Sequence, residues 1–247
     1  MRLDICLPIR NEEAILEGSA SKLQSFLREN FSAFSWRLVL LVNGSSDKSG
    51  EISRGLAARY PQQIVSLELR EGGKGRALRT WFASSQADIL AFMDADLAAS
   101  LSCLPQLIEP IASGRAEAVV GSRLLPGASI SRRPWRSLVS RTYNFISRLA
   151  LGHHFSDMQC GFKAFAGQAF RRIAPFCQDD KWFFDTEWLM LLQASGARIE
   201  ETAISWRDDR QSGRPSQVKV IRDTWRFLVQ LFRLRRRLKR MKIKQEI

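Results

Sequence analysis

Short apolar segments alternate with segments of helical spacing through the first half of the chain, and no other feature of the sequence restricts the fold as much. Apolar segments of strand length lie at residues 3–7, 37–42, 64–69 and 87–93. Between them, apolar residues recur at the spacing of a helix that buries one side. Because this order is typical of parallel sheets covered by helices on both faces, we predict an α/β fold with a doubly wound, mostly parallel sheet.

The second half of the chain is less regular, and its end is strongly basic. We expect a strand at 117–120, a helix at 135–151, a helix capped by Asp185 that stops at Gly196, and a last strand at 198–203. The one domain boundary that composition suggests lies near residues 212–215, where Ser, Gly and Pro precede the basic tail. We therefore predict a domain of residues 1–215 and a C-terminal segment of residues 216–247.

Polar residues follow each of the first four predicted strands. They are residues 8–12, 43–47 and 72–74, and the pair Asp94 and Asp96. The carboxyl ends of parallel strands meet at one edge of a sheet, and ligands of such sheets bind there. We therefore expect these four loops to form one site.

Asp94 and Asp96 directly follow an apolar strand and are separated by one residue. In an extended chain alternate side chains point to the same face, so the two carboxylates are expected to project together. Two converging carboxylates repel each other unless a cation lies between them, and hard oxygen ligands favour Mg²⁺ or Mn²⁺. The spacing alone is equally compatible with a turn that carries two solvated acids.

Residues 72–75, Gly-Gly-Lys-Gly, precede a predicted helix. Backbone N–H groups and an ammonium at a helix start suit a phosphate, although a surface turn has the same composition. The stretch lacks the GxxxxGK[ST] spacing, and no GxGxxG follows the first strand. Together with the acid pair on the neighbouring strand, Lys74 indicates a diphosphate held by a divalent metal.

Cysteine spacing and hydropathy restrict the compartment. The four cysteines are far apart and form no CxxC pair, which favours reduced thiols and a cytosolic location. The N-terminal residues lack the pattern of a signal peptide. No run of about 18 apolar residues, the length that spans a bilayer, occurs in the sequence. We expect a soluble or peripheral protein.

The net charge of +13 is concentrated in two segments. Residues 216–247 hold 11 Lys/Arg and 2 acids, residues 118–156 hold six Arg and no acid, and the remainder is slightly acidic. The tail is expected to form one amphipathic helix. Its predicted apolar side consists of Val218, Ile221, Trp225, Leu228, Phe232 and Leu238 or Met241.

Basic amphipathic helices with Trp, Phe and Leu on one side lie in membrane interfaces. The eight basic residues between 233 and 244 would each contribute roughly 1 kcal/mol at an anionic leaflet. One alternative is a helix docked on its own domain with a solvated charged end. Nucleic-acid binding is the other use of such charge, but no recognition motif accompanies it, so we predict no nucleic-acid partner.

Several stretches, taken together and in this order, resemble the motifs of family 2 glycosyltransferases, and most closely those of polyprenyl-phosphate sugar synthases such as dolichyl-phosphate glucosyl- and mannosyltransferases. Residues 184–188 and 204–206 extend the resemblance to roughly residues 3–220. The motifs are Leu7-Pro8-Ile9-Arg10-Asn11-Glu12-Glu13, Asn43-Gly44-Ser45-Ser46-Asp47, Gly73-Lys74-Gly75-Arg76-Ala77, Asp94-Ala95-Asp96, Gly121-Ser122-Arg123 and Asp157-Met158-Gln159-Cys160-Gly161-Phe162-Lys163.

The resemblance implies a GT-A (Rossmann-like) fold and a nucleotide-sugar donor, UDP- or GDP-linked. Asp94 and Asp96 would hold the Mg²⁺ or Mn²⁺ that bridges the donor diphosphate. The residues implied in contact with the nucleobase and ribose are Pro8, Arg10, Glu12 and Asn43. Two positions depart from the family pattern. Val42-Asn43 stands where paired acids are usual, and Ala98 stands where some members have a third polar residue near the metal.

The implied reaction transfers a hexose to a polyprenyl phosphate, dolichyl or undecaprenyl, at the cytoplasmic face of the membrane. A phosphate acceptor is already an anionic nucleophile, so direct displacement with inversion needs no general base. Arginine suits the acceptor phosphate, although a solvated surface role is the commoner one for each candidate. The candidates are Arg123, Arg132 and Arg133.

Asp157 matches a family position near the reaction centre, as a positioning residue or a base. His153 and His154 match no metal spacing, so we expect structural or surface roles. A family 2 enzyme with a sugar or other hydroxyl acceptor is the first alternative, but a carboxylate base in a Glu-Asp pair and QxxRW are both absent. The second alternative is a basic membrane or nucleic-acid adaptor on an inactive sheet.

Overall fold

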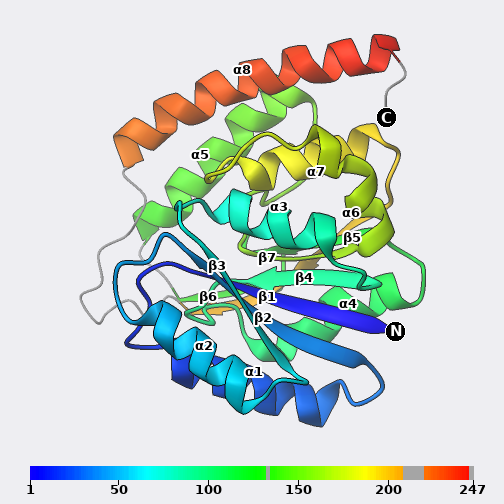
Figure 1. Ribbon diagram of the computed structural model, residues 1–247. Coiled ribbons are helices and arrows are strands. Elements are labelled where there is room, and N and C mark those ends of the chain that lie inside the picture. Colours follow the sequence, from blue (N-terminus) through cyan, green and yellow to red (C-terminus); the bar gives the residue numbers. More distant parts are fainter. Residues whose placement is uncertain (132–133, 208–219, 245–247) are drawn as a thin grey trace.

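The computed structural model describes residues 1–131, 134–207 and 220–244. Among these residues, seven strands form one sheet in the order β3-β2-β1-β4-β7-β5-β8 (Figure 1). The four strands predicted in the first half are all present, and they form one half of the sheet. The strands are β1 Arg2–Ile9, β2 Ser35–Asn43, β3 Ile64–Leu69, β4 Ile89–Met93, β5 Ala118–Ser122, β7 Phe162–Ala166 and β8 Ile199–Ala203.

All neighbouring strands in this sheet are parallel except β7, which is antiparallel to both β4 and β5. The register places Phe92 of β4 opposite Lys163 of β7. The mostly parallel sheet is therefore confirmed. β7 begins directly after the motif of residues 157–161, and nothing local in the sequence indicates its direction. Because β7 runs backwards through the middle of the sheet, the residues that precede it reach the carboxyl ends of its neighbours.

Helices cover both faces of the sheet, which confirms the doubly wound arrangement. One face packs against α1 Leu16–Asn30, α2 Ser49–Arg59 and α4 Leu104–Ala112, and the other against α3 Lys74–Ser84, α6 Gly167–Ile173 and α7 Phe184–Ala194. Side chains alternate along β1: Ile5 is buried on the first face and Cys6 on the second. Short 3₁₀ helices lie at Leu101–Cys103 and Ala174–Phe176.

A second helical layer lies outside α7 and consists of α5 Pro134–Leu151 and α8 Val220–Lys244. In Figure 1 the orange-to-red helix α8 runs along the outer side of α5 and α7. The rings of Tyr143 and Phe227 are 5.1 Å apart where α5 and α8 meet. The side chains that α8 buries in this contact are Leu231, Leu234, Leu238 and Met241.

The predicted C-terminal helix is present, but the prediction of which residues form its apolar side is wrong in part. Leu238 and Met241, the two candidates for the end of the predicted apolar side, are both buried against the rest of the protein, whereas Phe232 is 63% exposed. The helix therefore docks on its own domain. Val218 and the proposed boundary at residues 212–215 lie outside the described residues, as do the side chains of Ile221 and Trp225.

Two local predictions in the second half are wrong. Asp185 does not cap α7: it lies in the first turn, buried and paired with Lys163, and the carboxylate of Asp179 accepts the N–H groups at the helix start instead. Residues 199–203 do not form the last strand either. β9 Ser205–Arg207 follows and pairs with β6 Ser129–Ser131 in a separate two-stranded sheet.

Within the described ranges, no helix has both the length and the apolar character needed to cross a bilayer.

Candidate active site

Asp94 and Asp96 lie in the turn that follows β4, at the carboxyl edge of the sheet. Both side chains are half-buried, whereas Ala95 between them is buried. The strand ends at Met93, so the pair belongs to a turn and not to an extended segment. The Asp94 carbonyl accepts a hydrogen bond from the N–H of Leu97 at 3.0 Å, and Asp96 Oδ1 accepts one from Ala98 at 3.2 Å.

Lys74, the first residue of α3, reaches the acid pair. Its Nζ lies 2.7 Å from Asp94 Oδ1. Burial alone would lower the pKa of the Lys74 ammonium. The carboxylates of Asp94, Asp185 and Asp96 outweigh burial and raise this pKa above its ordinary value. Both acids of the pair therefore act on the same cation, as expected for two carboxylates that face one site.

Gly161 lies directly against the Asp94 carboxylate. A Cβ on Gly161 would lie 2.4 Å from Asp94 Oδ2 and 2.9 Å from its carboxyl carbon. Glycine is therefore required here for close approach and not for an unusual backbone angle. The sequence contained Gly161 within a motif, but nothing local indicated that it would contact an aspartate 67 residues earlier in the chain.

The residues of this turn fit a divalent metal bound together with a substrate. Among the described residues, no group of three or more His, Cys, Asp or Glu could hold a metal ion alone. Mg²⁺ is commonly bound by one or two carboxylates and the oxygens of substrate phosphates, so Asp94 and Asp96 suffice if a diphosphate completes the coordination. The Lys74 ammonium on Asp94 shows that the site already accommodates a cation.

Two of the four backbone N–H groups in the predicted phosphate cradle at residues 72–75 are used inside the protein. The N–H of Gly73 donates to Asn43 Oδ1, and the N–H groups of Gly75 and Arg76 donate to backbone carbonyls of residues 180–181. A Cβ on Gly73 would lie 2.4 Å from the carbonyl oxygen of Asp180. The glycines therefore permit tight packing of residues 178–183 on the start of α3. The Lys74 ammonium remains as the phosphate-binding candidate.

Asn43 at the end of β2 connects three parts of the site. Its Nδ2 donates to the carbonyls of Ile9 and Leu41 at 2.9 and 3.3 Å, and its Oδ1 accepts from Gly73 at 3.0 Å. The side chain is buried, and all three bonds go to backbone atoms. Asn43 is thus placed to position the loops after β1 and β3, and a contact with the nucleobase stays a prediction.

The other predicted donor residues lie at the same edge. Pro8 is half-buried near the end of β1, Glu12 is half-buried in the following loop, and Arg10 is exposed. A Cβ on Gly72 would lie 3.1 Å from the guanidinium carbon of Arg10, so the guanidinium lies over this glycine. The Glu12 N–H donates to Ser49 Oγ at 2.9 Å, which joins the loop after β1 to the start of α2.

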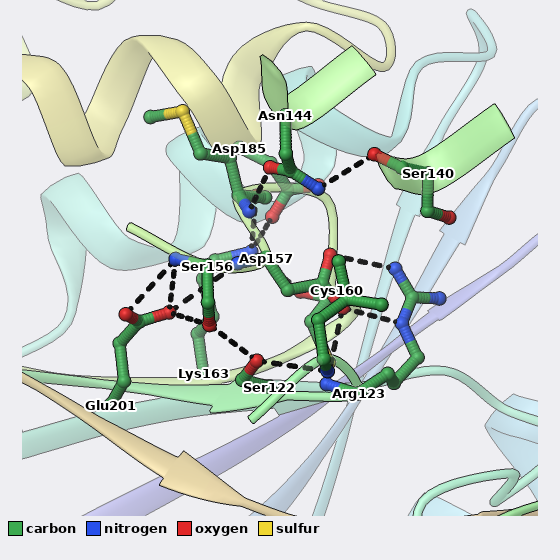
Figure 2. Close-up of polar contacts among 12 residues, drawn as sticks. Ser122, Arg123, Ser140, Asn144, Ser156, Asp157, Cys160, Lys163, Asp185 and Glu201 are labelled. Atoms are coloured by element: carbon green, nitrogen blue, oxygen red, sulfur yellow. Dashed lines mark hydrogen bonds and ion pairs between the residues drawn. The ribbon is translucent and has the colours of Figure 1, made fainter. Parts of the chain in front are cut away.

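Asp157 and Arg123 form a bidentate ion pair, shown in Figure 2, with distances of 2.7 Å from Nε to Oδ2 and 3.0 Å from Nη2 to Oδ1. Asp157 is fully buried. Burial would raise the pKa of its carboxyl, but the Arg123 guanidinium outweighs burial and holds the pKa below the ordinary value. Of the two predicted roles, this environment favours a positioning residue over a base, because a paired carboxylate is a weak proton acceptor.

Sequence reasoning missed the residues that hold the loop around Asp157. Glu201 of β8 accepts hydrogen bonds from the backbone N–H and the hydroxyl of Ser156 at 2.9 and 2.7 Å. Asn144 Oδ1 of α5 accepts the N–H of Met158 at 3.0 Å (Figure 2). Neither residue belongs to a motif, and each is close to the loop only because β8 and α5 pack there.

Lys163 and Asp185 form a second ion pair, which is almost completely buried. Lys163 Nζ lies 2.6 Å from Asp185 Oδ1 and donates to the carbonyl of Met158 at 3.0 Å. The one available signal was a lysine within the apolar strand sequence Phe-Lys-Ala-Phe. A charge in such a segment needs a buried partner, but the sequence did not identify Asp185 as that partner.

The remaining predictions concern two arginines and two histidines. Arg132 and Arg133 lie outside the residues that the structure describes. His153 is buried with its Nε2 2.9 Å from Ser147 Oγ, and His154 is exposed. The burial of His153 and the exposure of His154 agree with the expected structural and surface roles.

A mostly parallel sheet flanked by helices, with an acid pair and a lysine at the carboxyl edge, defines a GT-A-like α/β protein. The chain belongs to the family described as Glycosyl transferase family 2, whose profile matches residues 4–174. The family resemblance of the sequence motifs is thereby confirmed, and the chain is a glycosyltransferase domain.

Two curated relatives show where in the family the chain is similar. It is 31% identical to the glycosyltransferase AglD of Haloferax volcanii over 90% of this chain and 35% of that protein. It is 28% identical to the dolichyl-phosphate beta-glucosyltransferase ALG5C of Trichomonas vaginalis over 82% of this chain and 63% of that protein. The chain thus spans about a third of the length of AglD and less than two thirds of the length of ALG5C.

Solved structures support the fold. Glucosyl-3-phosphoglycerate synthase from Mycobacterium tuberculosis, in complex with Mn²⁺ and UDP-glucose, superimposes with a TM-score of 0.60. The similarity covers 93% of this chain and 78% of that chain at 19% sequence identity. At this identity the comparison shows the fold alone, and it confirms the predicted GT-A arrangement.

Proposed function

We propose that this domain transfers a hexose from a UDP- or GDP-sugar to a polyprenyl phosphate, with inversion at the anomeric carbon, at the cytoplasmic face of a membrane. The observation that carries the proposal is the ion pair of Asp94 with the ammonium of Lys74 at the carboxyl edge of the sheet, with Asp96 near enough to raise the pKa of the same ammonium. The dolichyl-phosphate beta-glucosyltransferases among the relatives support the lipid acceptor.

The donor would bind at the acid pair. When bound there, Mg²⁺ or Mn²⁺ supplies positive charge that stabilises the nucleotide as it leaves. Asp94 and Asp96 would hold the ion, and Lys74 would bind a phosphate oxygen. Pro8, near the end of β1, and Arg10 and Glu12, which follow it, would contact the nucleobase and ribose.

The acceptor needs positioning more than it needs activation, because a phosphate monoester is already an anion. The lowered pKa of Asp157 and its bidentate pairing with Arg123 are consistent with a mechanism that uses no general base. Arg123 is 11% exposed at its side chain and remains the described candidate for the acceptor phosphate. Arg132 and Arg133, outside the described part of the chain, would join it.

A membrane surface would meet the protein on the layer formed by α5 and α8. Described side chains on these helices include apolar residues that face solvent: Leu138, Val139, Phe145, Leu149 and Phe232. The exposed charges there are Arg141, Arg148, Arg233, Arg235, Arg236, Lys239 and Arg240, and no acid occurs among the described side chains of the two helices. Exposed apolar residues beside unopposed basic ones suit an anionic leaflet. This proposal adds α5 to the tail helix that the sequence indicated.

The catalytic proposal is tested by incubating the purified chain with Mn²⁺, a polyprenyl phosphate and a panel of UDP- and GDP-sugars. We expect a lipid-linked hexose with one donor, and near-complete loss with Asp94→Asn or Asp96→Asn. Asp88→Asn is the matched control, because Asp88 lies at the opposite end of β4 and accepts the N–H of Arg2.

Three results would contradict this proposal. No lipid-linked product with any donor would exclude the lipid acceptor. Transfer of the hexose to a sugar or another hydroxyl would favour a family 2 enzyme with a hydroxyl acceptor. Biological function that survives both aspartate substitutions would favour a non-catalytic adaptor.

The membrane proposal is tested by flotation with vesicles of phosphatidylglycerol and phosphatidylcholine. We expect binding to anionic but not to neutral vesicles, and a large loss with Arg235→Glu/Arg236→Glu. The matched control is Arg54→Glu/Arg59→Glu, because these exposed arginines lie on α2, on the other side of the sheet. Equal loss in both double variants would indicate nonspecific charge attraction and contradict a defined membrane surface.

A further inference from the structure

Lys74 is held in an enclosed position. Its side chain is 10% exposed. The ammonium lies 5.2, 5.7 and 5.9 Å from the ring centroids of Phe92, Phe184 and Trp182. Aromatic rings at such distances attract a cation, so the ammonium has neighbours that stabilise its charge besides its carboxylate partner. Lys74 is therefore a fixed part of the acid site and not a solvated lysine that meets Asp94 by chance.

The ammonium and a divalent metal would need the same carboxylate. Lys74 Nζ lies 2.7 Å from Asp94 Oδ1, and a Cβ on Gly161 would lie 2.4 Å from Oδ2 of the same carboxylate. Asp94 thus has little room to turn away from its partner. A metal that binds Asp94 without any other anion must displace the ammonium, which leaves a buried cation with less compensating charge.

A nucleotide diphosphate removes this conflict, because it brings its own anionic oxygens. The Lys74 ammonium can then bind phosphate, and Asp94 can bind the metal. We propose that Lys74 couples the two ligands: it holds Asp94 in the donor-free site and moves to the diphosphate when nucleotide and metal bind together. The inference rests on the proposed donor site. It adds that the site binds metal more weakly alone than together with a nucleotide diphosphate.

Coupling between two ligands is reciprocal, and typical values change affinity by about 5- to 150-fold. A variant without the Lys74 ammonium should therefore change metal affinity in two ways. Removing the ammonium should strengthen the binding of metal alone, because the ammonium no longer competes for Asp94. The same change should weaken the gain in metal affinity that nucleotide provides, because the diphosphate loses its partner.

The test measures free Mn²⁺ by electron paramagnetic resonance during titration of the full chain, with and without UDP or GDP. For Lys74→Met and Lys74→Gln we expect Mn²⁺ alone to bind roughly tenfold tighter than to the wild type, and the enhancement by nucleotide to shrink by a similar factor. Two substitutions of different polarity guard against misfolding of one of them, which circular dichroism would reveal.

Lys181→Met is the matched control. Lys181 is exposed in the loop next to Trp182, so this substitution removes one positive charge near the site without removing a partner of Asp94. We expect it to change Mn²⁺ affinity little. Equal strengthening by Lys181→Met would overturn the proposal in favour of a general charge effect, and unchanged affinity in both Lys74 variants would overturn it directly.

The experiment separates this inference from the proposed function. If the wild type binds no Mn²⁺ with or without nucleotide, the metal site itself is wrong and both proposals fall. If Mn²⁺ binds, requires Asp94, and responds to nucleotide equally in wild type and Lys74 variants, the donor site stands and only the coupling falls. Neither readout depends on the identity of the acceptor.

Discussion

Arg237 of the C-terminal helix α8 forms an ion pair with Glu187 of α7, and the carboxylate is almost completely buried. The other oxygen of Glu187 accepts the backbone N–H groups of Gln178 and Asp179, each at 2.9 Å. These residues begin the loop that packs on the glycines before α3 and ends beside Lys74. One carboxylate thus joins the basic helix to the loop that covers the candidate active site.

Arg237→Met should therefore affect both stability and catalysis. The substitution leaves a buried carboxylate without its charged partner, at a cost of about 2 kcal/mol of unfolding free energy. We also expect a higher KM for the nucleotide-sugar, because the loop next to Lys74 loses its support. Urea unfolding and steady-state kinetics measure the two effects. Arg240→Met, an exposed residue of the same helix, is the control and should change stability by less than about 0.5 kcal/mol.

Gly161→Ala should damage the metal site while the fold survives. A Cβ at this position would lie 2.4 Å from Asp94 Oδ2, so the carboxylate must move. Displacement of a reacting group by about 1 Å can cost about 100-fold in rate, and we expect weaker Mn²⁺ binding as well. Gly55→Ala is the matched control, because a Cβ there would have no atom within 4 Å. A Gly161→Ala enzyme with unchanged Mn²⁺ affinity would contradict this account of Asp94.

His153 should make the protein less stable in mild acid. Burial, helped by the nearby charge of Arg148, lowers the pKa of its imidazole from 6.5 to about 4. As pH falls below 6.5 the unfolded chain binds a proton that the folded chain binds only near pH 4, so the free energy of unfolding falls across this interval. The gap corresponds to about 3 kcal/mol.

Urea unfolding at several pH values between 4 and 7.5 measures this dependence. His153→Gln should lose the corresponding part of the slope, whereas His154→Gln, its exposed neighbour, should keep it. Parallel slopes for wild type and His153→Gln would show that the imidazole does not contribute.

Lys163→Met should be among the most destabilising single substitutions in the chain. It leaves the buried Asp185 carboxylate unpaired, and breaking such a pair typically costs about 3–5 kcal/mol. Replacing both members, as in Lys163→Met/Asp185→Leu, should recover part of the loss. Thermal unfolding of the two single variants and the double variant forms the required cycle, and strictly additive losses would contradict a direct pairing.

Much of the fold could be predicted because its signals are local. The apolar segments at residues 3–7, 37–42, 64–69 and 87–93 correspond to β1 to β4. Strand and helix periodicities are properties of a few consecutive residues, so the sequence displays them directly. The parallel order then places Asp94, Asp96 and Lys74 at one edge without further information.

The partners of these residues could not be predicted in the same way. Asp185 had the composition of a helix cap but pairs with Lys163 of β7, and the glycines before α3 had the composition of a phosphate loop but pack against residues 178–183. In each case the local sequence indicates one role, but the residue contacts a segment that is distant in sequence. The tertiary contact overrides the local preference.

The sequence by itself determined the alternating α/β architecture, the edge at which polar loops gather, and the acid pair Asp94 and Asp96, because all three follow from residue type and spacing. Only the tertiary structure decided that β7 runs antiparallel and brings Gly161 against Asp94, that Lys74 holds this carboxylate, and that α8 docks through Arg237. The reason is physical: buried charges and close backbone approaches are stabilised by whichever segments pack beside them, and that neighbourhood exists only in the folded chain.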